Sequence, residues 1–321
     1  MAPAKVKLGI LLPTRGLLLG PSPARDAELV IRLARRAEAA GMDSVWVGDS
    51  LTAKPRLEPL ATLAAVAACT ERVRLGTAVL LAALRHPVLL AQTMATVDLI
   101  SAGRLVVGAG VGGAFNHEQR QEWKAAGVDP GRRATRMEEI LRIVQQLGEG
   151  DPVTFSGKHF CLDQVRIEPR PVQPGGVPIL LASHWRGQQE TQLARAARLG
   201  NGLISISDTP EEYCLLVQRV REMVSALGRD ASPFETAFYM TVNINYDSSK
   251  ADAEATEFLT RYYGANIWGD RWGPFGDPER IKQRISEYVE AGAETLIVRF
   301  ASIRPEAQLE TFLDRVAPAF L

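Results

Sequence analysis

The chain has 321 residues, of which 46% are hydrophobic, and its 37 Lys and Arg residues are balanced by 37 Asp and Glu residues. A chain of this length can bury a large core, and its neutral charge leaves no electrostatic footprint for nucleic acid or an anionic membrane. Three widely separated cysteines without a Cys-x-x-Cys motif are typical of a reduced, cytoplasmic protein. The N-terminal apolar run Leu8 to Leu12 is too short for a signal peptide or a membrane span.

Short apolar runs alternate with amphipathic stretches along the whole chain, as a parallel α/β fold requires. The first strand is predicted at 6–12, and the helix that follows at 26–41 ends at Gly41, a residue that favours helix termination. The other predicted strands are 44–48, 73–80, 104–110, 178–183, 202–206, 236–245 and 295–300. The other predicted helices are 58–70, 87–101, 133–148, 188–199, 210–227, 249–262, 278–291 and 305–316.

Eight strands, each followed by a helix, predict a closed (β/α)8 TIM barrel rather than an open doubly wound sheet. We expect a single domain over residues 1–321, because no repeat or linker interrupts the alternation. Insertions are expected after the fourth strand, at 112–132, and between the seventh and eighth strands. The polar, proline-rich segment 151–178 is predicted to contain a small hairpin with strands "VTF" (153–155) and "VRIEP" (165–169).

The segment "VVGAGVGGAF" (106–115) contains a G-x-G-x-x-G pattern at Gly108, Gly110 and Gly113. On its own, this pattern suggests a dinucleotide-binding loop. Such a loop belongs in the first βαβ unit and opens directly into a helix, whereas these glycines follow the fourth strand and no clean helix follows at once. The glycines therefore indicate the C-terminal end of a barrel strand, where active sites are built and where glycine lets a flat ligand approach.

Seven segments in a fixed order cover most of the chain. They are "AEAAGMDSVWVGDS" (37–50), "ATLAAVAACTERVRLGTAVL" (61–80), "RHPVLLAQTMATVDLISAGRLVVGAGVG" (85–112), "RRATRMEEIL" (132–141), "PILLAS" (178–183), "LARAARLGNGLIS" (193–205) and "GDPERIKQRISEYVEAGAETLIVR" (276–299). Together they resemble the bacterial-luciferase-like family of flavin- and deazaflavin-dependent oxidoreductases. The resemblance implies an eight-stranded barrel with insertions and, as cofactor, either reduced FMN or coenzyme F420.

The resemblance also implies where the cofactor lies. Its ring should contact the ends of the first four strands, at Pro13, Asp49, Thr77, Ala78, Val79, Gly110, Val111 and Gly112. Two of these glycines, Gly110 and Gly112, are expected to leave room for the ring. In deazaflavin-dependent members the third strand carries a non-prolyl cis peptide, and the matching bond is Ala78–Val79. The cofactor phosphate should rest just before a helix N-terminus, near Ser183, His184, Trp185, Arg186 and Gly187.

The catalytic candidates are Asp49, His86 and His117. Asp49 either hydrogen-bonds the cofactor or substrate or caps the next segment. His86 either titrates in the pocket or packs at a helix start, and His117 either reaches the barrel mouth or lies on the surface. Two positions depart from what the resemblance implies, and each departure removes a usual proton donor. Ser50 stands where many members have a histidine, and Gly113 stands where sugar-phosphate dehydrogenases have a catalytic glutamate.

The aromatic, glycine-rich segment 262–277 is expected to help wall the substrate pocket. Its candidates are Trp268 and Trp272, and Arg299 at the end of the eighth strand could bind an acidic group of the substrate or cofactor. No group of His, Cys, Asp and Glu has the spacing of a metal site, so no metal is expected.

The main interpretation is a monooxygenase that uses reduced FMN to oxygenate a small organic substrate, with a flavin reductase as a candidate partner. One alternative is hydride transfer by coenzyme F420, and another is a non-catalytic cofactor-binding or partner subunit. A homodimer is expected, because family members are usually dimers and because two predicted helices carry the apolar surfaces "LATLAAVAAC" (60–69) and "VLLAQTMATV" (88–97). Nucleic acid and membrane partners are not expected.

Overall fold

The structure is a computed structural model that describes residues 6–19, 27–186, 189–265, 271 and 273–321. Its barrel strands are β1 (Lys7–Leu11), β2 (Ser44–Val47), β3 (Arg74–Leu80), β4 (Leu105–Ala109), β7 (Ile179–Ala182), β8 (Gly202–Ile206), β9 (Glu235–Ile244) and β11 (Thr295–Phe300). They pair in parallel in the order β11-β1-β2-β3-β4-β7-β8-β9, and β9 pairs with β11 to close the ring. This confirms the predicted closed barrel. The short strand β10 (Phe275–Gly276) pairs with β9.

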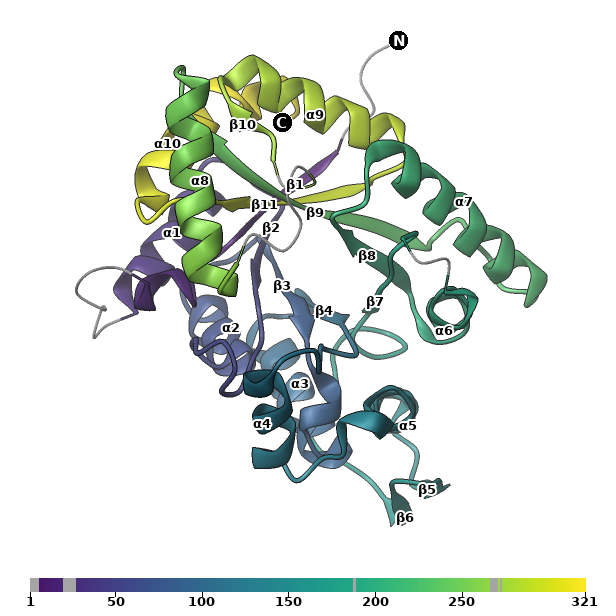
Figure 1. The fold of residues 1–321 in the computed structure, drawn as a ribbon. Helices are drawn as coiled ribbons and strands as arrows, with labels where there is room; N and C mark the ends of the chain where they lie inside the picture. The colour runs from purple at the N-terminus through teal and green to yellow at the C-terminus, as the bar shows by residue number, and fades with distance from the viewer. Residues whose placement is uncertain (1–5, 20–26, 187–188, 266–270, 272) are drawn as a thin grey trace.

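The helices surround the barrel (Figure 1). Those that connect or follow the strands are α1 (Glu28–Ala39), α2 (Pro59–Ala67), α3 (Pro87–Ile100), α5 (Arg133–Glu149), α6 (Glu190–Leu199), α7 (Pro210–Ala226), α9 (Pro278–Glu290) and α10 (Pro305–Arg315). The two insertions contribute α4 (His117–Ala125) and α8 (Ser248–Tyr263). Within the described residues, no helix is long and apolar enough to cross a membrane.

Alternate residues of the strands fill two separate parts of the core. The larger cluster packs the outer faces of the strands against the helices. A smaller cluster inside the barrel takes side chains from most of the strands: Leu11, Trp46, Val106, Leu180, Ile204, Ala237, Tyr239 and Ile297. Trp46 is fully buried there, and its indole fills the space that a Cβ on Gly76 would need. The barrel interior is therefore packed solid, and the space for a ligand lies above it, at the ends of the strands.

The segment after α5 departs from the predicted hairpin. Its strands are β5 (Val153–Ser156) and β6 (Cys161–Val165), so the second strand precedes the predicted 165–169. The cause is the carboxylate of Glu139 on α5, which accepts hydrogen bonds from the backbone N–H groups of Lys158, His159 and Phe160. This tertiary contact places the turn of the hairpin between Ser156 and Cys161, so the second strand begins before the predicted position. The insertion at 112–132 contains the helix α4, which was not among the predicted helices. An Asn116–Gln119 capping box starts this helix.

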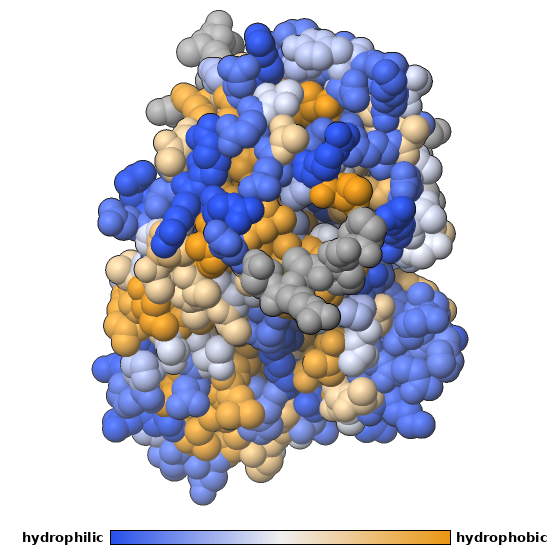
Figure 2. All heavy atoms as spheres, turned by 90° about the vertical axis from the view of Figure 1, so that its left-hand side faces the viewer, coloured by the Kyte–Doolittle hydropathy of each residue, from blue (hydrophilic) through white to orange (hydrophobic). Residues whose placement is uncertain are grey.

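The outward face of α3 carries no charge, because the only charged residue of the helix, Asp98, is fully buried. Leu89, Leu99 and Ile100 lie exposed on this helix. Elsewhere, on the face that carries α1, α2 and α8, apolar patches lie between hydrophilic ones (Figure 2). The homodimer stays a prediction, and α3 is where we expect its interface.

We expect static light scattering at micromolar concentration to give the mass of two chains. The double substitution Leu89→Glu with Leu99→Glu should give the mass of one, because two charges would be buried in the contact. Leu215→Glu, at an exposed leucine of α7, is the matched control and should leave the mass unchanged. A parent protein with the mass of one chain would contradict the prediction.

Candidate active site

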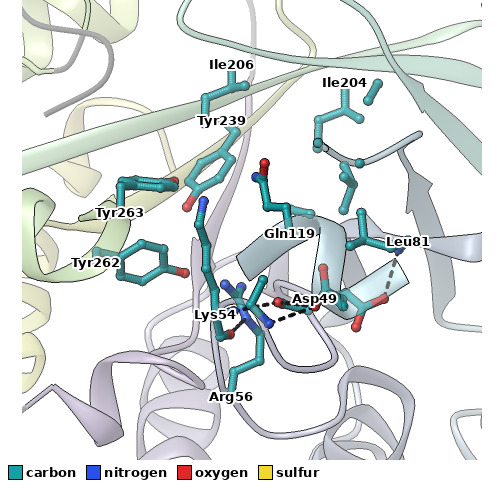
Figure 3. A pocket seen from close by; sticks show the side chains of 18 of the residues that line it. Asp49, Lys54, Arg56, Leu81, Gln119, Ile204, Ile206, Tyr239, Tyr262 and Tyr263 are labelled. Atoms are coloured by element: carbon teal, nitrogen blue, oxygen red, sulfur yellow. Dashed lines mark hydrogen bonds between the residues drawn. The ribbon is translucent and has the colours of Figure 1, made fainter. Parts of the chain in front are cut away.

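A pocket with a cavity volume of ≈ 230 Å³ lies at the C-terminal ends of β2, β3, β7, β8 and β9. One wall is apolar and consists of Ala78, Val79, Leu81, Ala182, Ile204 and Ile206. The facing wall is polar and aromatic, and it comes from the loop after β2, from β9 and from the end of α8 (Figure 3). An apolar wall faced by a few convergent polar groups is the usual arrangement of a site for an organic cofactor.

The bulge in β3 shapes the apolar wall. The register between β3 and β4 shifts between Thr77 and Leu80, and the Ala78–Val79 peptide bond is cis. The cis bond confirms the prediction made from the resemblance. Ala78 and Val79 both line the pocket, whereas Thr77 is buried and donates its hydroxyl proton to the carbonyl oxygen of Gly108 at 2.8 Å.

Only some of the predicted cofactor contacts line the pocket. Those that do are Asp49, Ala78, Val79, Gly112 and His184. Pro13, Thr77, Gly110, Val111, Ser183, Trp185 and Arg186 lie outside its lining. Gly187, Trp268 and Trp272 lie outside the described residues.

Gly110 has a different neighbour from the one expected. A Cβ at this position would lie 2.6 Å from Cγ2 of Val79, so the missing side chain makes room for Val79 rather than for a ligand. Gly112 does line the pocket and has a positive φ of 76°, which favours glycine. A Cβ there would lie 3.0 Å from the ring of Trp123 and 3.2 Å from Leu81. The glycine-rich segment is thus explained mainly by close packing around the bulge.

Asp49 lies in the pocket lining, but other residues bind its carboxylate. Its side chain is 3% exposed and pairs with Arg85 at 2.5 Å. It also accepts a hydrogen bond from the backbone N–H of Leu81 at 2.9 Å. Arg85 makes a second ion pair, with Glu58 at 2.9 Å. The carboxylate therefore ties the end of β2 to the end of β3 and to the start of α2.

The other two catalytic candidates lie away from the pocket. His86 is exposed at the N-terminus of α3, with its ring edge-on to Phe160 at 5.6 Å between centroids. His117 is exposed on the first turn of α4, where it contacts Gln121. Neither side chain lines the cavity.

Two residues of α4 that the sequence reasoning did not select do line the pocket, Gln119 and Glu122. Glu122 is buried, and its Oε1 accepts hydrogen bonds from the Ser50 hydroxyl at 2.6 Å and from the backbone N–H groups of Thr52 and Ala53. The carboxylate thus holds the loop after β2 in place. The sequence did contain a signal for these two pocket residues, namely the capping box at Asn116 and Gln119. A capping box predicts the start of a helix, and that helix orients both side chains.

His184 also lines the pocket, beside Ser205 and Asp208. The Ser205 hydroxyl donates to Asp208 Oδ2 at 2.5 Å and lies 3.4 Å from His184 Nδ1. Burial lowers the pKa of His184 below its usual value, although the Asp208 carboxylate opposes this effect, so burial favours the neutral ring. A neutral imidazole can hydrogen-bond a phosphate or a cofactor ring, but it adds no positive charge.

The tyrosines of the polar wall are Tyr239, Tyr262 and Tyr263 (Figure 3). Arg299 lies behind them and is 2% exposed, and it donates to Tyr263 Oη at 2.6 Å and to Thr241 Oγ1 at 2.8 Å. Its guanidinium therefore supports the tyrosine wall instead of lining the cavity itself. Among the residues that the structure describes, no group of three or more His, Cys, Asp and Glu side chains could hold a metal ion.

A ligand pocket at the C-terminal ends of the strands of a (β/α)8 barrel defines the class of the chain as a barrel enzyme. A family model described as luciferase-like monooxygenase matches residues 6–272. The chain therefore belongs to the luciferase-like monooxygenase family. It is an oxidoreductase, and its cofactor is FMN or coenzyme F420. The non-catalytic alternative is not supported.

Individual relatives refine this assignment. The chain is 28% identical to the F420-dependent glucose-6-phosphate dehydrogenase of Amycolatopsis mediterranei, over 90% of this chain and 93% of that protein. It is 31% identical to the enzyme of the same name from Mycolicibacterium fortuitum, over 84% and 86%. It is 24% identical to the 5,10-methylenetetrahydromethanopterin reductase of Methanopyrus kandleri, over 99% of both chains.

Solved structures show the same fold. An F420-dependent secondary alcohol dehydrogenase in complex with an F420-acetone adduct matches with a TM-score of 0.79 and 22% identity, over 99% of this chain and 100% of that chain. The monooxygenase RslO1 from Streptomyces bottropensis matches with a TM-score of 0.82 and 24% identity, over 98% and 100%. At these identities the structures support the barrel and do not distinguish the two cofactors.

Proposed function

We propose that the chain is an F420-dependent oxidoreductase that transfers a hydride between coenzyme F420 and a small organic substrate. The observation that carries the proposal is the set of relatives named for F420, which are 28% and 31% identical to this chain over at least 84% of its length. This alternative is better supported than the FMN monooxygenase that was the main interpretation of the sequence. The chemistry that F420 supplies when bound is hydride transfer without oxygen.

The residues of the pocket fit such a cofactor. Ala78, Val79 and Ile204 belong to the apolar wall against which a planar ring can pack, and they would keep water away from its face. His184, which also lines the pocket, can hydrogen-bond the ring or its phosphate.

The proton donor is not the one that the resemblance implies. Gly113 lines the pocket but has no side chain to donate a proton, and the hydroxyl of Ser50 is bound to Glu122. The glutamate-dependent reaction of the sugar-phosphate dehydrogenases is therefore not proposed for this chain. Its substrate must be one for which another group, or water, transfers the proton.

The cofactor assignment is tested by fluorescence titration of the purified protein with F420 and, separately, with FMN. We expect F420 to bind at least about tenfold more tightly than FMN, a difference of ~1.4 kcal/mol. Reduction of F420 by a panel of secondary alcohols and hydroxy acids, measured without oxygen, then tests hydride transfer. Preferential binding of FMN with oxygen-dependent turnover would instead favour the monooxygenase.

A further inference from the structure

One wall of the pocket carries an excess of positive charge. Lys54 and Arg56 line the cavity, and the loop after β2 holds both. The guanidinium carbons of Arg15 and Arg299 lie 5.2 Å and 5.0 Å from the ring centroid of Tyr262. The guanidinium carbon of Arg56 lies 5.6 Å from the same centroid, so three arginines meet around one tyrosine, close to Lys54.

The carboxylates that line the pocket do not balance this charge. Asp49 is paired with Arg85, and Glu122 accepts hydrogen bonds from the loop after β2. In the part of the chain that the structure describes, no ion pair includes Lys54 or Arg56. The Lys54 ammonium instead lies over the ring of Tyr263, 4.4 Å from its centroid, and points into the pocket between the tyrosines (Figure 3).

Neighbouring titratable groups show the effect of this positive potential. The pKa of Lys54 falls to about 8, first because of burial and then because Arg56, Arg15 and Arg299 repel its charge. The pKa of Tyr262 lies below its usual value although burial acts to raise it, because the same three arginines favour the phenolate. Both shifts have the sign expected where several cations lie close together.

We propose that Lys54 and Arg56 form an oxyanion subsite of this pocket and that the substrate therefore carries a carboxylate or phosphate group. The inference rests on the proposed function, since it names the substrate class of the same site. An ammonium and a guanidinium give charge-assisted hydrogen bonds to either oxyanion. The apolar wall remains available to the cofactor ring and to the reacting carbon of the substrate.

The subsite should depend on pH. Oxyanion binding favours the charged form of Lys54, so affinity should be greatest below pH 8 and should fall as the pH rises above this value. Ionisation of Tyr262, whose pKa lies below its usual value, would weaken anion binding in the same direction. The groups that face Lys54 are Arg15, Arg56, Arg299, Glu122, Tyr239, Tyr262 and Tyr263.

Calorimetric titration with sulfate, which does not titrate between pH 7 and 9, tests the subsite. We expect Lys54→Met to weaken sulfate binding about tenfold at pH 7 and Lys54→Arg to weaken it by no more than about threefold. Lys158→Met, at an exposed lysine in the turn of the β5–β6 hairpin, is the control for net charge and should bind as the parent does. The parent should lose affinity between pH 7 and pH 9, and Lys54→Met should lose much less over the same range.

Repeating the titration with F420 present identifies the source of the oxyanion. Simultaneous binding of sulfate and F420 supports a substrate subsite, whereas mutual competition overturns it and assigns Lys54 to the phosphate of the cofactor. Equal sulfate affinity in the parent and Lys54→Met overturns the subsite altogether.

A comparison of inorganic phosphate with acetate identifies the oxyanion that the subsite prefers. Tighter binding of phosphate indicates a phosphate group on the substrate, tighter binding of acetate indicates a carboxylate, and either result supports the subsite. Sulfate binding as expected without F420 binding would contradict the proposed function and leave the subsite intact.

Discussion

Asp49→Ala should lower the free energy of unfolding by about 3 kcal/mol, because it leaves the partly buried Arg85 guanidinium without its closest partner. The backbone N–H of Leu81 also loses its acceptor. The change should weaken F420 binding as well, since Leu81 and the neighbouring bulge form part of the apolar wall. Urea denaturation gives the first quantity, and fluorescence titration gives the second.

Glu58→Gln is the matched control for Asp49→Ala. It removes the other carboxylate that pairs with Arg85, but the Glu58 side chain is 51% exposed. The glutamine oxygen can still accept the hydrogen bond from the Ala61 N–H at the start of α2. The expected loss is therefore within about 1 kcal/mol. An Asp49→Ala protein that is as stable as the parent but inactive would show that Asp49 takes part in the reaction itself.

Gly108→Ala should be the most damaging single change in the glycine-rich segment, with an expected loss of about 3 kcal/mol in the free energy of unfolding. A Cβ on Gly108 would overlap the carbonyl oxygen of Thr77, a backbone atom that cannot move without displacing the bulge of β3. The same displacement would move Ala78 and Val79 in the pocket wall, so F420 affinity should fall together with stability.

Gly113→Ala provides the comparison within the same segment. A Cβ on Gly113 would lie 2.7 Å from Nε2 of Gln119 and 3.0 Å from a ring carbon of Phe115. The Gln119 amide is the far end of a flexible side chain, and Phe115 is exposed, so both can shift. The expected loss is within about 1 kcal/mol. Thermal and urea unfolding of both variants measure the difference, and equal stabilities would contradict the role assigned to Gly108.

Much of the fold could be predicted from the chain because its signals are local. Buried parallel strands appear as short apolar runs, and each crossover helix appears as a 3.6-residue pattern with its own start and stop residues. Eight such units lead to closure of the barrel, which the pairing of β9 with β11 confirms. The cis bond at Ala78–Val79 was predicted from the resemblance of a continuous segment to known proteins.

The composition of the pocket could not be predicted in the same way. Its polar wall combines Lys54 and Arg56 with Tyr239, Tyr262 and Tyr263, which lie about two hundred positions further along the chain. No periodic pattern links such residues, because they become neighbours only when the barrel closes. The loop after β2 is likewise positioned by Glu122, from the insertion that follows β4.

The roles of the candidate residues follow the same division between local and tertiary signals. That Asp49 follows a strand at the barrel mouth could be predicted from the chain alone, because the apolar run before it is unambiguous. Tertiary contacts were needed to show that Arg85 and Leu81 bind its carboxylate and that His86 and His117 lie outside the pocket lining. Strand and helix patterns depend on neighbours in the chain, whereas the role of a polar side chain depends on the charges and donors that folding brings within a few ångströms of it.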